Sequence, residues 1–150
     1  MILTYQIVQS EPVKTFLKNQ DYSKRTLSAI KLNGALLLNG SPVTVRHVMD
    51  KGDRLEVHFP SETPSENLIP YDKELEVIYE DAYLIIVNKP QMQNCAPSRE
   101  HPHGSLVEQV LAYLQQSFTR YVPHIVTRLD RNTSGIVIFT KHGYIHHLMS

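Results

Sequence analysis

A proline-rich segment in the middle of the chain limits what this sequence can fold into. Residues Pro60 to Pro70 read PSETPSENLIP, which is rich in Pro, Ser and Glu and contains no Gly. Proline stiffens a chain and offers no N–H group to a sheet, so this segment is expected to be an extended linker. The sequence therefore predicts two small units, residues 1–60 and 71–150, joined by a linker at residues 61–70.

Two helices are predicted early in the first unit. Val13, Phe16 and Leu17 recur at spacings of three and four residues, which is the period of a helix with one buried face. A second helix is predicted to begin after Ser23, a good N-cap residue, and to stop at Asn33-Gly34.

A hairpin and a further strand are predicted to follow these helices. The stretch ALLLNGSPVTV, residues 35–45, has an Asn-Gly pair between two apolar runs, which is a strong signal for a hairpin turn. After the turn-forming Lys51-Gly52-Asp53, residues 54–59 read RLEVHF and alternate apolar with polar side chains, as a half-buried strand does.

The second unit begins with two predicted strands, Glu76 to Tyr79 and Tyr83 to Asn88, joined by a turn at Glu80-Asp81. Leu84 to Val87 is apolar at every position, which predicts a central strand buried on both faces.

An irregular loop at residues 91–104 is followed by an amphipathic helix at 105–118 with Ser105 as its N-cap, and residues 142–150 begin another helix. Tyr79, Tyr83 and Tyr113 have core-like spacings and are expected to pack inside. The predicted fold class is α+β: a small helix-helix-hairpin domain followed by a mixed, mainly antiparallel sheet.

Charge is distributed unevenly between the two units. Residues 13–59 contain eight Lys and Arg against four acids, whereas residues 61–81 contain seven acids and only Lys73 as a base. This asymmetry favours a first unit that faces a polyanion such as RNA. A solvated helical surface explains the same charges equally well, so charge alone does not choose between them.

Several classes of protein are excluded or disfavoured. Cys95 is the single cysteine, so no intramolecular disulfide framework is possible, and a reducing cytoplasm is the expected location. No apolar run approaches the roughly 18 residues that a membrane span needs, and the first residues lack the pattern of a signal peptide. The histidines lack the cysteine or carboxylate neighbours of a typical metal site, so no metal is expected.

The stretch TRLDRNTSGIVIFTK, residues 127–141, is the sharpest chemical signal. Asp130 lies between Arg128 and Arg131, and a predicted strand follows. Opposite charges within a few ångströms keep a carboxylate ionised, and an ionised carboxylate in a cleft can act as a nucleophile or a stabilising charge. Asp130 to Gly135 are also turn formers, so a plain connection between strands explains the local pattern equally well.

Two family resemblances resolve these alternatives. Residues 13–59, with a Ser-Lys-Arg helix entry, the LNG hairpin and KGDRLEV, resemble the S4 RNA-binding fold. RLDRNTSGIVIFTK closely resembles the catalytic motif of the RluA-type RNA pseudouridine synthases, and EVIYEDAYLIIVNKP resembles the strand pair that opens their catalytic domain.

The second resemblance implies an isomerase that converts specific uridines of ribosomal or transfer RNA to pseudouridine. It implies that Asp130 is the catalytic carboxylate, that Arg128 holds its charge and orientation, and that Arg131 reaches an RNA phosphate. Thr133 and Ser134 are expected to fix the loop through side-chain bonds to the backbone, and Gly135 to allow close backbone approach. No metal or organic cofactor is implied.

RNA is the expected partner, and neither DNA nor a membrane is expected; the oligomeric state is not predicted. The residues expected to contact RNA in the first unit are Lys14, Lys18, Lys24, Arg25, Lys31 and Arg46. The family's catalytic domain continues well past this motif, so we expect this chain to be an N-terminal portion that is inactive alone. The alternative is an RNA-binding protein without catalytic activity.

Overall fold

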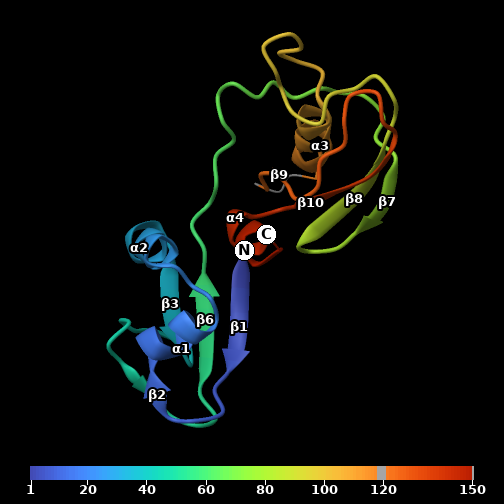
Figure 1. Cartoon of the computed structure of the whole chain (residues 1–150). Helices are drawn as coiled ribbons and strands as arrows, with labels where there is room; N and C mark the ends of the chain where they lie inside the picture. Colours follow the sequence, from blue (N-terminus) through green and yellow to red (C-terminus); the bar gives the residue numbers. More distant parts are fainter. Residues whose placement is uncertain (118–120, 150) are drawn as a thin grey trace. The chain divides into compact units, whose positions relative to one another are not determined.

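The computed structural model describes residues 1–117 and 121–149, and the chain forms two compact units, Met1–Ser61 and Glu62–Ser150. In Figure 1 the first unit runs from blue to green and the second from green to red. Each unit combines an antiparallel sheet with helices, as the sequence predicts for an α+β protein.

The first unit is built on a four-stranded antiparallel sheet. Its strand order is β1-β6-β3-β4, so that β6 lies inside the sheet. The strands of this sheet are β1 (Ile2–Gln6), β6 (Arg54–His58), β3 (Ala35–Leu38) and β4 (Ser41–Pro42). A separate ladder pairs β2 (Glu11–Pro12) with β5 (Val48–Met49).

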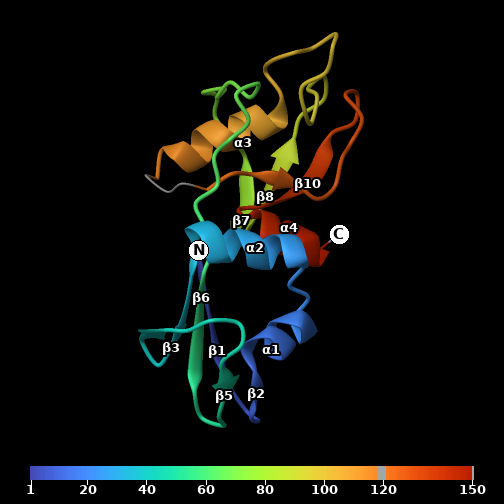
Figure 2. The same ribbon diagram turned by 90° about the vertical axis from the view of Figure 1, so that its left-hand side faces the viewer.

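The two predicted helices of the first unit are confirmed as α1 (Val13–Asn19) and α2 (Lys24–Asn33). The Ser23 hydroxyl accepts a hydrogen bond of 3.1 Å from the Thr26 N–H and so caps α2. Both helices lie on the same side of the sheet (Figure 2).

The core of the first unit forms between these helices and one face of the sheet. Leu55 and Val57 of β6 are fully buried, as are Val13 and Leu17 of α1. The alternation predicted for residues 54–59 is therefore confirmed, because every second side chain of β6 points at the helices.

The hairpin predicted around Asn39-Gly40 is also confirmed. Both residues have positive φ, +50° and +86°, which is the conformation that a two-residue hairpin turn requires. The Asn39 side chain fixes the turn, because its amide donates to the Asp53 carboxylate at 3.0 Å and its oxygen accepts from Arg54 N–H at 2.9 Å. The second strand ends at Pro42 and is shorter than predicted.

The second unit contains another four-stranded antiparallel sheet, in the order β7-β8-β10-β9. Helix α3 lies against one face of this sheet (Figure 2). The elements of this unit are β7 (Val77–Glu80), β8 (Leu84–Lys89), α3 (Leu106–Gln115), β9 (His124–Ile125), β10 (Gly135–Thr140) and α4 (Gly143–Met149).

The predicted helix at 105–118 is confirmed over Leu106–Gln115, and Phe118 lies outside the described residues. Ser105 and Glu108 form a capping box, in which the Ser105 hydroxyl bonds the Glu108 N–H and the Glu108 carboxylate bonds the Ser105 N–H. The first turn of α3 is therefore rigidly fixed. The helix predicted to begin in residues 142–150 is confirmed as α4.

The core of the second unit lies between α3 and one face of the sheet. Ile85, Val87, Val137 and Phe139 are fully buried there against α3. The central place of β8 is confirmed, but the expected burial on both of its faces is wrong: Leu84 and Ile86 are only half-buried, since α3 covers only one face.

The expected core packing of two tyrosines is likewise wrong. Tyr79 and Tyr83 are 49% and 40% exposed, and the Tyr79 hydroxyl donates a hydrogen bond to Asp81. Tyr113 is partly buried against the core.

Residues 61–70 contain no helix or strand, yet they are fastened to the second unit. The Ile69 N–H donates to the Glu108 carboxylate at 2.7 Å, and Glu62 accepts a hydrogen bond from the Gly143 N–H at 3.1 Å. Burial raises the pKa of the Glu108 carboxyl, but the hydrogen bonds from Ile69, Ser105 and His103 outweigh it and lower the pKa overall.

Candidate functional site

Residues 126–134, which join β9 to β10 and include Asp130, form the candidate catalytic loop; they lie at the end of the second sheet where β8 finishes and β10 starts. Lys89 at the end of β8 pairs with Gly135 at the start of β10. The segment that follows β8 and the segment that precedes β10 therefore emerge at the same end of the sheet. The loop itself joins β9 to β10, and the Val126 N–H bonds the Ile138 carbonyl at 2.8 Å near its base. Asp130 is thus presented at the tip of a hairpin.

Asp130 lines an open cavity of about 410 Å³ formed by Asn94–Ser98 on one side and Arg128–Arg131 on the other. The Asp130 and Arg128 side chains are exposed, and Arg131 is half-buried. The Thr133 N–H donates to the Asp130 carbonyl at 3.0 Å and closes a tight turn. The cavity therefore combines one carboxylate with two arginines in a place that solvent and a ligand can reach.

The two arginines do not pair with Asp130. Among residues 1–117 and 121–149, no ion pair within 4.0 Å joins Asp130 to Arg128 or Arg131. Instead, Arg131 Nη1 donates to the Asn94 side-chain oxygen at 3.1 Å. The exposed Arg128 guanidinium and the other N–H groups of Arg131 can therefore meet an anionic ligand beside the carboxylate.

The expected side-chain bonds of Thr133 and Ser134 are wrong. Both side chains are exposed, and in the described part of the chain the loop is closed by the Thr133 backbone N–H rather than by either hydroxyl. Gly135 has a φ of +147°, and an added Cβ would lie 3.3 Å from Leu129 Cδ1. A side chain at position 135 would therefore crowd the candidate catalytic loop. The close backbone approach expected at Gly135 stays a prediction.

Lys89 is a component of the site that the sequence did not identify. It is fully buried, and its Nζ donates to the carbonyl oxygens of Pro90 at 2.8 Å, Gln93 at 2.9 Å and Arg131 at 3.2 Å. Burial lowers the pKa of the Lys89 amine; the Arg131 charge adds to this, while Cys95 and Asp130 oppose it. Lys89 thereby ties the loop after β8 to the candidate catalytic loop.

The six residues expected to contact RNA are all exposed in the first unit. Lys14 and Lys18 are four residues apart on α1, so they share one face of that helix. The Lys14 N–H bonds the Val45 carbonyl at 2.9 Å, which brings the start of α1 beside the segment that carries Arg46. Lys24, Arg25 and Lys31 all lie on α2.

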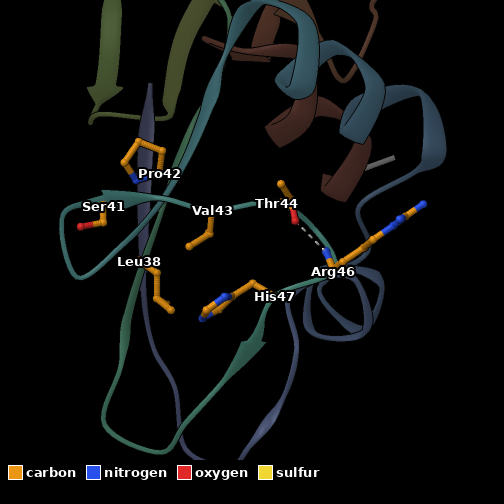
Figure 3. Close-up of a pocket in the computed structure, with 7 residues that line it drawn as sticks. All are labelled: Leu38, Ser41, Pro42, Val43, Thr44, Arg46 and His47. Atoms are coloured by element: carbon orange, nitrogen blue, oxygen red, sulfur yellow. Dashed lines mark hydrogen bonds between the residues drawn. The ribbon is translucent and has the colours of Figure 1, made fainter.

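An open hollow of about 750 Å³ lies next to Arg46 in the first unit, between the β3–β4 hairpin and residues 43–47. Figure 3 shows that the Arg46 side chain extends away from this hollow, whereas Leu38 and Val43 line it. The Thr44 hydroxyl accepts a hydrogen bond of 3.4 Å from the Arg46 N–H. This contact fixes the backbone from which Arg46 reaches into solvent.

Within the described ranges, no group of three or more His, Cys, Asp or Glu residues has the arrangement that holds a metal ion. The Glu62 carboxylate lies 3.1 Å from His124 Nε2 and 3.8 Å from His142 Nε2. Over those same ranges, no helix is long and apolar enough to cross a bilayer.

Comparison with known proteins shows which family the segment around this site resembles. Residues 83–150 match the family model described as RNA pseudouridylate synthase. This match contains β8, Lys89, the cavity and the whole candidate catalytic loop. Residues 83–150 are therefore similar to the RNA pseudouridylate synthase family.

Individual relatives agree with this assignment. The chain is 41% identical over 139 residues to the uncharacterized RNA pseudouridine synthase YjbO of Bacillus subtilis. The aligned residues make up 92% of this chain and 49% of that protein. It is 33% identical over 124 residues to ribosomal large subunit pseudouridine synthase D of Neisseria meningitidis, covering 81% of this chain and 32% of the relative. The chain thus spans about half the length, or less, of these relatives.

Proposed function

We propose that this chain supplies the RNA-binding unit and the catalytic carboxylate of an RNA pseudouridine synthase that acts on uridines of ribosomal or transfer RNA. The observation that carries the proposal is the place of Asp130. It is exposed at an open cavity between two arginines that make no ion pair with it in the described residues, inside the segment that matches the family.

The reaction is an isomerisation, so all atoms are retained. The bond between N1 of uracil and C1′ of the ribose breaks, the uracil turns, and a bond forms between C5 and C1′. The proton on C5 is then lost, and N1 gains one. Asp130 either adds to the nucleoside or removes a proton from the sugar, and both routes need the ionised carboxylate.

The open cavity suits a nucleotide that has left its stack. The uridine atoms that react are out of reach inside a helix, so the target must be extruded toward the enzyme. Arg128 and Arg131 beside Asp130 can hold the phosphates on either side of such a nucleotide. This arrangement accounts for two cations close to a carboxylate that must stay free to react.

The first unit is proposed to bind RNA in the manner of an S4 domain. Its six candidate cations are exposed, and they lie on α1, α2 and the segment after β4. Phosphate contacts of this kind give affinity and orientation without reading sequence.

The test is formation of pseudouridine by the full-length protein on ribosomal and transfer RNA transcripts. Asp130→Asn keeps the shape of the side chain but removes its charge, so activity should fall at least about 100-fold. RNA affinity should stay within about twofold. Asp21→Asn, a change of an exposed acid in the first unit, is the matched control and should leave activity unchanged. RNA binding by a wild-type protein that forms no pseudouridine would favour the non-catalytic alternative.

A further inference from the structure

The two residues that flank Asp130 are both held by the same short segment of the chain. The Cys95 thiol donates to the Leu129 carbonyl at 3.3 Å and accepts from the Leu129 N–H at 3.4 Å. The Asn94 side-chain oxygen accepts from Arg131 Nη1 at 3.1 Å. Asp130 therefore lies between one residue held through its backbone and another held through its side chain.

This segment is itself fixed to α3. The Leu106 N–H donates to the Asn94 carbonyl at 2.8 Å, and the Val107 N–H donates to the Cys95 carbonyl at 3.0 Å. These N–H groups belong to the first turn of the helix, where no intrahelical acceptor exists, so they bind the segment firmly. The capping box of α3 keeps that first turn in place.

The Asn94 amide is also oriented from its other end. Its Nδ2 donates to the Ser98 hydroxyl at 3.0 Å, and the same hydroxyl accepts a hydrogen bond from the His101 N–H at 3.1 Å. The amide cannot turn away from Arg131 without losing the bond to Ser98. A continuous set of contacts thus runs from α3 through Asn94 and Cys95 to the catalytic loop.

We propose that Asn94 and Cys95 are positioning residues for the Asp130 carboxylate: the Cys95 thiol sets the backbone before it, and Asn94 sets the Arg131 guanidinium after it. This inference rests on the proposed function. The Asp130 side chain is exposed, so its place depends on the two residues beside it. A displacement of about 1 Å in a reacting group can cost about 100-fold in rate.

The test compares pairs of variants in the full-length protein, with kcat and KM measured separately for pseudouridine formation. Cys95→Val and Asn94→Leu keep the approximate shape of each side chain but remove its hydrogen bonds. Both should lower kcat by about 10- to 100-fold. Cys95→Val should leave KM within about threefold, whereas Asn94→Leu should also raise KM, because Arg131 is proposed to hold an RNA phosphate. Cys95→Ser retains a donor and an acceptor, and Asn94→Asp retains the acceptor for Arg131, so both should restore most of kcat.

Val107→Ala is the matched control for loss of stability. Val107 belongs to the same hydrophobic core as Cys95. Its hydrogen bond to Cys95 comes from its backbone N–H, which the substitution preserves. The melting temperature of the Val107→Ala variant should fall, while its kcat stays close to that of the wild type. If Cys95→Val keeps full kcat, or if Val107→Ala loses kcat equally, the positioning role is overturned.

Hydrogen exchange of the Leu129 amide gives a second measurement that does not depend on activity. Exchange should accelerate at least about tenfold in Cys95→Val and stay near the wild-type rate in Cys95→Ser, since only the serine can still accept the Leu129 N–H. Unchanged exchange in Cys95→Val overturns the contact, whether or not the protein is a synthase. A wild-type protein with protected Leu129 but no activity contradicts the proposed function instead.

Discussion

Lys89 donates a hydrogen bond of 3.2 Å to the carbonyl of Arg131, the residue that follows Asp130. The Met92 N–H donates to the same carbonyl at 2.8 Å. Met92 has a positive φ of +64°, which is uncommon for a residue with a side chain, and these contacts hold it in that conformation. The loop after β8 and the catalytic loop therefore form one connected structure.

Lys89→Met is expected to lower the free energy of unfolding by about 2–4 kcal/mol, because it removes the buried donor that three carbonyl oxygens share. The methionine side chain fills similar space, so the loss should come from hydrogen bonding rather than from a cavity. Chemical denaturation of the full-length protein measures the change. Pseudouridine formation by the folded variant should also fall, since the Arg131 carbonyl loses one of its two hydrogen-bond donors.

Lys73→Met is the matched control, because the Lys73 side chain is exposed. Its stability should stay within about 0.5 kcal/mol of the wild type. Equal stability of the two variants would show that the Lys89 hydrogen bonds contribute nothing.

Glu108→Gln tests the buried carboxylate that fastens residues 61–70 to α3. The folded protein holds the pKa of Glu108 below its ordinary value. The stabilisation is therefore present above the pKa of the unfolded chain and is lost as pH falls through the folded pKa. We expect the variant to be less stable by about 1–3 kcal/mol at pH 7.

The difference between Glu108→Gln and the wild type should shrink as the solution is acidified below about pH 4, near the unfolded pKa of a glutamate. Thermal unfolding measured from pH 7 to pH 3 checks this. A difference that stays constant over that range would mean that the charge of Glu108 is not what stabilises the fold.

Local signals in the sequence were sufficient for the helices and the hairpin. Ser23 and Ser105 identify their helix starts because a capping hydroxyl acts within three residues. Asn39-Gly40 identifies its turn because positive φ is a property of those two residues themselves. In each case the physical cause lies inside the motif.

The sequence could not predict features that depend on distant partners. Strand β1 was missed because its partners lie in β6, with Leu3 opposite Val57. The burial of Lys89 was missed because one of its three acceptors, the Arg131 carbonyl, is 42 residues away. The motif points to Asp130 and its two arginines. It could not reveal the hydrogen bond between Arg131 and Asn94, because these residues are 37 positions apart.

Gly34→Ala should destabilise the first unit for steric reasons. Gly34 follows α2, and an added methyl group would overlap the His58 carbonyl and press on the Ile30 backbone. Neither contact is with a flexible side chain, so the backbone must shift, at a cost of about 1–3 kcal/mol. Urea unfolding of the variant measures this cost.

Ser28→Ala provides the comparison, since Ser28 is exposed on α2 and alanine favours helices. It should be neutral or slightly stabilising. A Gly34→Ala protein as stable as the Ser28→Ala protein would mean that the end of α2 can move away from β6 at little cost.

The proposed RNA-binding role of the first unit predicts a change in salt dependence. Replacing Lys24 and Arg25 by Ala removes two exposed cations at the start of α2. Fewer counterions are then released on binding. The slope of log affinity against log salt should become shallower by about 0.7 for each phosphate of a single strand that the variant no longer neutralises. Filter binding of an RNA transcript at several salt concentrations gives the slope.

A matched change of charge separates a specific contact from the overall field of the unit. Lys51 and Arg54 are also exposed, but they belong to the turn before β6 and to β6 itself, and Arg54 pairs with Glu56 at 3.4 Å. Replacing both by Ala removes the same formal charge and should leave the slope nearly unchanged, because neither cation is proposed to touch RNA. Equal slopes for the two double variants would contradict an RNA surface on α2, whereas a shallower slope for Lys24 and Arg25 alone would support it.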